Sequence, residues 1–163
     1  MDDVHYSSSN HEWETPDDLF QALDDVFVFT LDVCATDDNA KVPTYFTEEE
    51  DGLKNSWEGH NCWMNPPYGR EIGKWIRKAA EESEKGITVV CLVPARTDTK
   101  WWFDMLNYVD EVWFIRGRLQ FKGAKSCAPF PSAILVFGSP GFGSMPRGRA
   151  KLGRYEIWPV SVR

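Results

Sequence analysis

The sequence predicts an open α/β sheet in which short apolar strands alternate with amphipathic helices. Helical periodicity and strand-like apolar runs alternate along most of the 163-residue chain. The run 87–95 is almost wholly apolar, as is typical of a central parallel strand covered on both faces. Hydrophobic residues make up 42% and charged residues 26%, which are ordinary globular values. We therefore expect residues 1–163 to form a single domain.

Three segments have the pattern of helices. Residues 15–27 open with a helix-start signal, because Thr15 is a candidate N-cap, Pro16 suits the first helical position and two aspartates follow. Residues 69–86 place apolar side chains on one face and Lys and Glu on the others. Residues 98–109 are the third expected helix.

Five segments have the pattern of strands: 27–35, 60–65, 87–95, 110–121 and 132–138. Helices separate the middle strands, so the sheet is expected to be mostly parallel. The last two strands are joined by a loop, which predicts an antiparallel hairpin at the sheet edge. We expect residues 1–12 to be frayed and residues 139–163 to be a basic, partly irregular tail. Because ligands bind at the carboxyl ends of parallel strands, residues 32–35 and 65–68 would face one crevice.

Several classes of protein are disfavoured by composition. No apolar run approaches membrane-spanning length, and the first residues lack the pattern of a signal peptide. We therefore expect no membrane partner and a cytoplasmic location. The cysteines are widely spaced and form no CxxC pair, and the histidines have no partner at metal-ligand spacing, so no metal site is expected.

Charge is distributed unevenly along the chain, whose net charge is −7. Residues 1–64 hold 2 Lys or Arg and 16 Asp or Glu, a balance of −14. Residues 116–163 hold nine Lys or Arg and a single acid, Glu156. Such a chain can present a basic face to a polyanion despite its acidic total. A chance gathering of surface cations is the alternative explanation of the charge pattern alone.

The segment WMNPPYGR (63–70) restricts its own backbone. Proline has a carbonyl acceptor and no N–H, and a residue before proline is held extended. The side-chain oxygen of Asn65 and the carbonyl oxygen of Pro66 can therefore converge on one amino group, with Tyr68 as a flat face beside it. Two such acceptors make the nitrogen of a planar amine more nucleophilic toward a methyl donor. The segment indicates methyl transfer to a planar NH2 group, although Asn-Pro after a strand is also ordinary turn chemistry.

Asn65-Pro66-Pro67-Tyr68 resembles the catalytic motif of amino-directed, S-adenosylmethionine-dependent methyltransferases. Residues 11–138 resemble, in order, the compact DNA N6-adenine methyltransferases of bacteriophages and prophages, the Dam-like phage family. The segments that carry this resemblance are EWETPDDLFQAL (12–23), LDVCATDDNAK (31–41), YFTEEEDGLKNSW (45–57), VCLVPARTDTKWW (90–102), FIRGRLQF (114–121) and APFPSAILVF (128–137). The resemblance implies a compact Rossmann-like methyltransferase sheet without a large target-recognition domain, and a phage or prophage origin. If the chain is phage-encoded, its location would be the host cytoplasm.

The resemblance implies that the protein transfers a methyl group from S-adenosylmethionine to N6 of an adenine flipped out of double-stranded DNA. The implied catalytic and target-base residues are Asn65, Pro66, Pro67 and Tyr68. The implied cofactor contacts are Trp13, Thr15, Pro16, Asp32, Cys34 and Ala35. The glycine-rich turn that is usual in methyltransferases is absent from DVCATDDNA. Three acids are candidates for the cofactor ribose: Asp37, Asp38 and Asp51.

Cations late in the chain are the expected DNA contacts, mostly to phosphates. They are Arg96, Lys100, Arg116, Arg118, Lys122 and Lys125, and Arg118 has an equally good interpretation as a structural arginine paired with an acid. Two alternatives remain open. One is a methyltransferase of another planar NH2 substrate, either an RNA base or a protein glutamine. The other is a degenerate relative that binds DNA without catalysis. The sequence does not give the oligomeric state.

Overall fold

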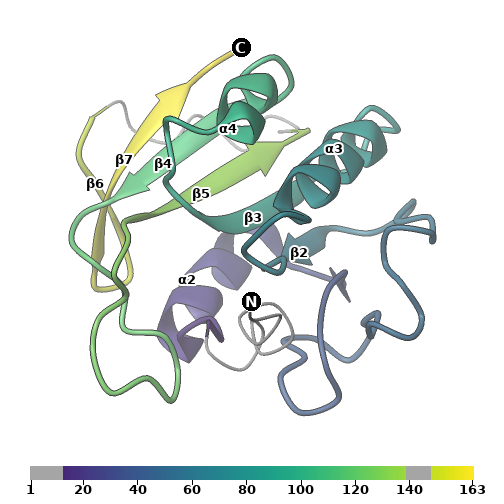
Figure 1. Ribbon diagram of the computed structural model, residues 1–163, viewed down its shortest axis with the longest axis horizontal. Coiled ribbons are helices and arrows are strands. Elements are labelled where there is room, and N and C mark those ends of the chain that lie inside the picture. Colours follow the sequence, from purple (N-terminus) through teal and green to yellow (C-terminus); the bar gives the residue numbers. More distant parts are fainter. Residues whose placement is uncertain (1–12, 139–147) are drawn as a thin grey trace.

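The computed structural model describes residues 13–138 and 148–163, which form one seven-stranded sheet with helices on both faces (Figure 1). The strand order is β1-β2-β3-β5-β4-β7-β6. The helices are α2 (Asp17–Phe27), α3 (Ile72–Ser83) and α4 (Lys100–Met105). The strands are β1 (Leu31–Asp32), β2 (Cys62–Met64), β3 (Val89–Pro94), β4 (Glu111–Ile115), β5 (Ser132–Phe137), β6 (Ala150–Leu152) and β7 (Tyr155–Ser161). The expected α/β class is confirmed, and none of the helices described is long and apolar enough to cross a membrane.

The prediction of a mostly parallel sheet is wrong. Only the β1–β2 and β2–β3 pairs are parallel, whereas β3–β5, β4–β5, β4–β7 and β6–β7 are antiparallel. The physical reason is that loops join β4 to β5 and β6 to β7, so the second strand of each pair turns back beside the first, and β5 lies between β3 and β4. The β4–β5 hairpin is also not at the sheet edge, because β3 flanks it on one side and β7 on the other.

Strands β6 and β7 were not predicted, since the tail was expected to be partly irregular. In β7 the side chains of Tyr155 and Ile157 are buried while that of Trp158 is exposed, which is the alternation of a half-covered strand. Pro159 within the run argues against a central strand. It is accommodated because β6 pairs only with residues 155–157, which leaves Pro159 where β7 has one neighbour.

Two apolar layers enclose the sheet. Ile72, Trp75 and Ile76 of α3 pack with Met105 of α4 against one face, which includes Cys91 of β3. On the other face, α2 contributes Leu19, Phe20 and Leu23, which pack with Trp63, Val90 and Ile134 among others. Alternate residues of each strand enter opposite layers, as the pleat requires. The central strands are thus fixed from both sides, and so are the loops at their carboxyl ends.

Strand register brings the two predicted functional loops together. Asp32 at the end of β1 lies opposite Trp63 of β2, two residues before Asn65. Met64 lies opposite Cys91 of β3. The parallel part of the sheet therefore places the loop after β1 and the NPPY segment after β2 at one edge, as expected for a crevice at strand carboxyl ends.

Candidate active site

Asn65 follows β2, and the Nδ2 and Oδ1 atoms of its side-chain amide have different surroundings. The Nδ2 group donates to the carbonyl oxygen of Trp13 at 2.8 Å and to the Oγ1 atom of Thr15 at 3.1 Å. The Oδ1 atom is buried and has no hydrogen-bond partner among the residues that the structure describes. Buried acceptors are nearly always paired in folded proteins, so this oxygen is a strong candidate for a ligand contact.

Pro66, Pro67 and Tyr68 complete the motif. Pro66 is buried, and neither proline brings an N–H that would compete for the nearby acceptors. The half-buried Tyr68 donates from its hydroxyl to the carbonyl oxygen of Leu92 at 3.2 Å. Burial raises the pKa of this phenol well above its ordinary value. Tyr68 is therefore a fixed neutral ring and is not a proton acceptor for catalysis.

Three further rings surround Tyr68, and we call the four residues Trp13, Tyr68, Phe121 and Phe130 the aromatic wall. The Trp13 ring lies 5.3 Å from Phe121 and 5.0 Å from Phe130 between centroids, both edge-on. Tyr68 lies 5.8 Å from Phe130 in the same manner. Such edge-to-face packing is favourable between aromatic rings. Sequence reasoning missed Phe121 and Phe130 as site residues, because both come from the segment between β4 and β5.

Asp32 is a buried carboxyl at the end of β1, with 2% of its surface exposed. Its oxygens accept from the backbone N–H of Lys41 at 3.1 Å and of Cys34 at 3.3 Å. Burial is the main cause that raises its pKa from 3.8 to about 7, and the two backbone bonds oppose this only in part. The carboxyl is therefore poised to ionise near neutral pH and would be stabilised as an anion by a cationic ligand.

A narrow recess joins these groups. Its walls are Glu14, Thr15, Asp32, Cys34, Asn39, Lys41, Trp63 and Asn65. Its free space of about 10 Å³ holds about one water molecule, so a larger group enters only if the walls move. The predicted cofactor residues Thr15, Asp32 and Cys34 are thus brought together with Asn65. Pro16 instead occupies the N-cap position of α2.

The loop after β1 is ordered without glycine. None of its residues between Val33 and Lys41 has positive φ, so the usual glycines are not required for its backbone. Thr36 and Asn39 exchange side-chain bonds to each other's backbone N–H, at 2.7 and 3.2 Å. A close approach is made from the neighbouring segment, where a Cβ on Gly52 would lie 2.2 Å from the Val33 carbonyl oxygen. The missing glycine-rich turn is thus no obstacle to an ordered loop.

A shallow basin of about 440 Å³ lies beyond Ala35, lined also by Thr36, Asp37, Thr47, Glu48 and Glu49. Asp37 accepts a hydrogen bond from the Tyr45 hydroxyl at 2.6 Å. Asp51 instead stabilises its own turn, where it accepts from the Leu53 N–H at 3.1 Å and pairs with Lys54. Of the three acids considered for the ribose, Asp37 is the one that lines this basin.

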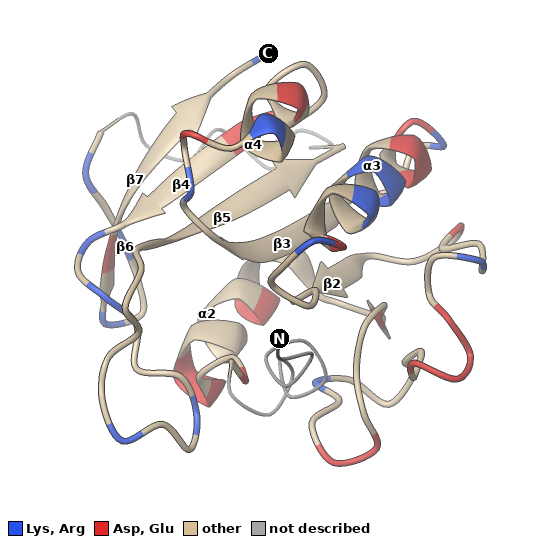
Figure 2. Cartoon of the chain, viewed as in Figure 1, with Lys and Arg blue, Asp and Glu red and all other residues tan. Residues whose placement is uncertain are grey.

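The predicted DNA contacts are partly engaged by acids. Figure 2 shows cations along the segment between β4 and β5 and along α3, and acids along the segment between β1 and β2. Lys100 pairs with Asp104, Arg116 with Glu156, and Lys122 with Asp17 and Glu14. Arg118 donates a long bond of 3.5 Å to the Ala128 carbonyl oxygen. Arg96 lies 5.5 Å from the centre of the Phe130 ring, and Lys125 makes no ion pair with any described residue.

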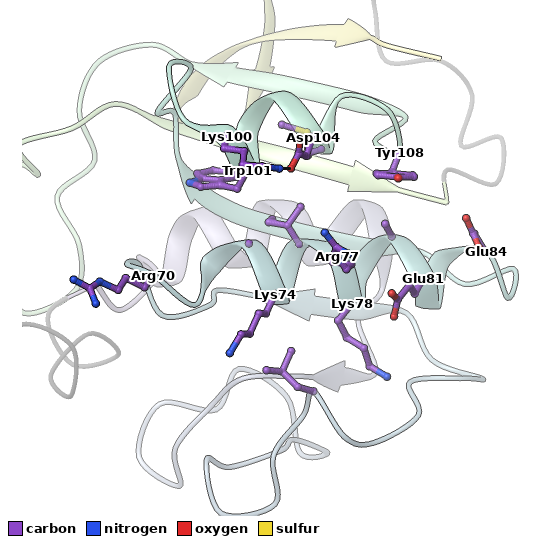
Figure 3. Close-up of a pocket in the computed structure, with 15 residues that line it drawn as sticks. Arg70, Lys74, Arg77, Lys78, Glu81, Glu84, Lys100, Trp101, Asp104 and Tyr108 are labelled. Carbon is purple, nitrogen blue, oxygen red and sulfur yellow. Dashed lines mark hydrogen bonds and ion pairs between the residues drawn. The ribbon is translucent and has the colours of Figure 1, made fainter.

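A larger hollow lies elsewhere, in a groove of about 970 Å³ between α3 and α4 (Figure 3). Its lining mixes cations and acids: Arg70, Lys74, Arg77, Lys78 and Lys100 with Glu81, Glu84 and Asp104. It contains none of the predicted catalytic or cofactor residues, so its size does not identify the active site. Arg70, two residues after Tyr68, is an exposed cation near the motif that sequence reasoning missed. Among the described residues, no cluster of His, Cys, Asp and Glu could hold a metal ion.

Comparison with known proteins gives the family. The profile of the family described as DNA N-6-adenine-methyltransferase (Dam) matches residues 5–137. A DNA N-6-adenine-methyltransferase of Haemophilus phage HP1 is 35% identical over 113 residues, which are 67% of this chain and 65% of that protein. One of Escherichia phage T1 is 28% identical over 109 residues, which are 66% of this chain and 45% of that protein. The chain thus spans less than two thirds of the length of both relatives, and it belongs to the DNA N-6-adenine-methyltransferase (Dam) family.

Proposed function

We propose that this protein transfers a methyl group from S-adenosylmethionine to N6 of an adenine in double-stranded DNA. The observation that carries the proposal is the buried Oδ1 atom of Asn65, which has no partner among the described residues and belongs to a side chain that lines the recess. An adenine amino group has two hydrogens to donate and would satisfy this acceptor. Membership in the family and the relatives from two phages support the same substrate.

The target base is held by the NPPY segment and the aromatic wall. Asn65 Oδ1 and the Pro66 carbonyl oxygen accept the two N6 hydrogens and draw the nitrogen lone pair out of conjugation with the ring. Preorganised polar contacts of this kind each stabilise a transition state by about 3 kcal/mol. Trp13 and Tyr68, the two partly exposed rings of the aromatic wall, offer stacking surface to a base removed from the duplex, and the buried Phe121 and Phe130 support them. No strong base is needed, because the N6 proton can leave to solvent after transfer.

The cofactor is held along the end of β1. The recess would take its cationic methionine end once the walls move, since Asp32 is a buried carboxyl whose ionised form needs a positive partner. The basin beside Ala35 fits its ribose, with Asp37 as the acceptor. When bound, S-adenosylmethionine supplies the electrophilic methyl group. Trp13 contributes its ring to the aromatic wall and Cys34 lines the recess, whereas the Thr15 hydroxyl is already bonded to the Asn65 side chain.

Transfer of labelled methyl groups tests the proposal. The protein is incubated with S-adenosylmethionine that carries a tritiated methyl group, in parallel with unmethylated duplex DNA, RNA and a protein extract. We expect label in DNA, recovered as N6-methyladenine after nucleoside digestion. Label in RNA or protein alone would move the substrate to the corresponding alternative. Binding of the cofactor without transfer to any of the three would identify a degenerate relative.

Lys125 and Lys122 provide a matched pair for the DNA interface. Affinity for duplex DNA falls as salt is added, and Lys125→Gln is expected to make this fall less steep. The slope of log affinity against log salt should decrease in magnitude by about 0.9, because one phosphate contact is lost. Lys122→Gln should lower it less, since that ammonium is already held by Asp17 at 3.0 Å. Fluorescence anisotropy between about 50 and 200 mM salt measures both slopes. Equal slopes for the two variants and the unmodified protein would remove Lys125 from the interface.

A further inference from the structure

The two ends of an asparagine amide have opposite hydrogen-bonding characters. The terminal torsion is broad and roughly two-fold, so the oxygen and the NH2 group can exchange places without a change in side-chain shape. If Asn65 were turned over, an NH2 group would take the place of the unpartnered Oδ1 and would repel the amino group of a target base. The proposed reaction therefore requires a structural element that decides which end of Asn65 faces inward.

The backbone of Trp13 fixes which end of the Asn65 amide faces inward. Its carbonyl oxygen lies 2.8 Å from Asn65 Nδ2 and can only accept a hydrogen bond. A turned amide would set two oxygens against each other at this place. The Thr15 hydroxyl, 3.1 Å from Nδ2, can either accept or donate, so it holds the amide without selecting its orientation. The selection by Trp13 and the support by Thr15 leave Oδ1 as the inward atom.

Thr15 is available for this contact because its side chain does not cap α2. The N-cap position of α2 is taken by Pro16, and no side chain caps that end. The expectation that Thr15 caps the helix is therefore wrong. Thr15 is almost fully buried, at 1% exposure, and its hydroxyl accepts a hydrogen bond from Asn65, 50 residues away. The buried Thr15 hydroxyl is therefore satisfied by a long-range bond to Asn65 and not by a local bond to the helix backbone.

The segment of residues 13–15, which we call the strap, is itself fixed on both sides. The Trp13 ring packs between Phe121 and Phe130. The Glu14 carbonyl oxygen accepts from the Lys122 N–H at 2.8 Å. The Thr15 carbonyl oxygen accepts from Lys41 Nζ at 3.0 Å. Contacts from two distant segments thus hold the strap in the geometry that orients Asn65.

We propose that the strap is a positioning element for the proposed reaction, in which the Trp13 carbonyl and the Thr15 hydroxyl hold Asn65 with its oxygen toward the target amine. This role rests on the proposed function and differs from the cofactor contact that the resemblance implies for Thr15. It also predicts which residues are tolerated at position 65. An aspartate has no N–H to offer the Trp13 carbonyl, so the strap makes this site specific for asparagine.

Thr15→Val and Thr15→Ser form the test. Valine keeps the shape and removes the acceptor, whereas serine keeps the hydroxyl. We expect Thr15→Val to lower the single-turnover rate of methyl transfer about tenfold or more, with the Kd for S-adenosylmethionine within about threefold of the unmodified protein. We expect Thr15→Ser to stay within about threefold of the unmodified rate. A valine variant with an unchanged rate overturns the proposal. So does one whose cofactor Kd rises in proportion to its loss of rate, because that result assigns Thr15 to cofactor binding.

A spectroscopic measurement separates this inference from the proposed function. In protein labelled with ¹⁵N-asparagine, the two side-chain N–H signals of Asn65 should exchange slowly with solvent, since both are held by the strap. Thr15→Val should speed their exchange at least tenfold and Thr15→Ser should not. Equal exchange in all three proteins overturns the strap as a positioning element, whether or not any substrate is methylated. If the unmodified protein transfers no methyl group while the exchange pattern holds, the proposed function fails and the strap stands.

Discussion

Asn65→Ala is expected to lower the rate of methyl transfer to DNA by about 10³-fold. The alanine removes the inward acceptor, and the loss of one preorganised polar contact commonly lowers kcat by about 10² to 10³. It also removes the side chain that the strap would orient. Cofactor binding should change little, because Asp32 and the basin remain. Single-turnover methylation of duplex DNA and calorimetric titration of S-adenosylmethionine measure the two quantities.

The matched control for Asn65→Ala is Asn55→Ala. Asn55 also donates from its side-chain amide to two oxygens, those of Glu50 and Asp51, but it lies outside the recess. Its substitution should leave the transfer rate within about threefold. The Asn65 substitution leaves the Trp13 carbonyl unpaired, which lowers the free energy of unfolding by about 1–3 kcal/mol, so thermal melting must show that the protein is folded at the assay temperature. A folded Asn65→Ala protein with undiminished rate would contradict the assignment.

Below pH 7, cofactor affinity is expected to fall about tenfold for each unit by which the pH is lowered. Above pH 7, affinity should be constant. Burial raises the pKa of Asp32 to about 7, so below that pH the carboxyl is neutral and cannot pair with a cationic methionine group. Asp32→Asn should weaken binding about 10²-fold at pH 8 and abolish the pH dependence. Titration calorimetry at several pH values between about 5.5 and 8.5 measures both effects.

The same pKa shift makes the free energy of unfolding depend on pH in the opposite direction to cofactor affinity. Because the folded protein binds the Asp32 proton more tightly than the unfolded chain does, this group's contribution is greatest below its ordinary pKa of 3.8. The contribution falls as the pH rises to about 7 and is constant above that. In Asp32→Asn, the free energy of unfolding should no longer decrease over this pH range. Urea unfolding without cofactor measures it. Unchanged pH dependence of both binding and unfolding would show that Asp32 is not the titrating group.

Local patterns predicted the centre of the fold well. The segments around β2, β3 and β5 are apolar without interruption, so their strands could be recognised without tertiary information. The helix between β2 and β3 accounts for their parallel pairing. Strands β1 and β2, whose pairing brings Asp32 and Asn65 to one edge, are instead joined by a segment without a helix. The tail was missed because Gly153 and Pro159 argue locally against strands, while pairing with β4 supplies the missing stabilisation.

Contacts between distant segments account for what the sequence could not predict at the site. The aromatic wall forms only when the β4–β5 segment folds back over Tyr68. The bond from Asn65 to Thr15 joins residues whose local patterns indicate a turn and a helix start. The charge pattern placed the candidate DNA contacts late in the chain, but it did not indicate that Asp17 holds Lys122 or that Glu156 holds Arg116. Those pairings depend on side-chain positions that no local pattern encodes.

The position of the strap ahead of α2 matters for how shortened versions of this protein are made. A fragment begun at α2 would keep every helix and strand of the described fold, including the whole sheet. It would nevertheless lack the Trp13 carbonyl and the Thr15 hydroxyl that hold Asn65. A folded but inactive fragment of this kind could be mistaken for a naturally inactive relative. We therefore expect an active fragment to include residues 13–15, which precede α2.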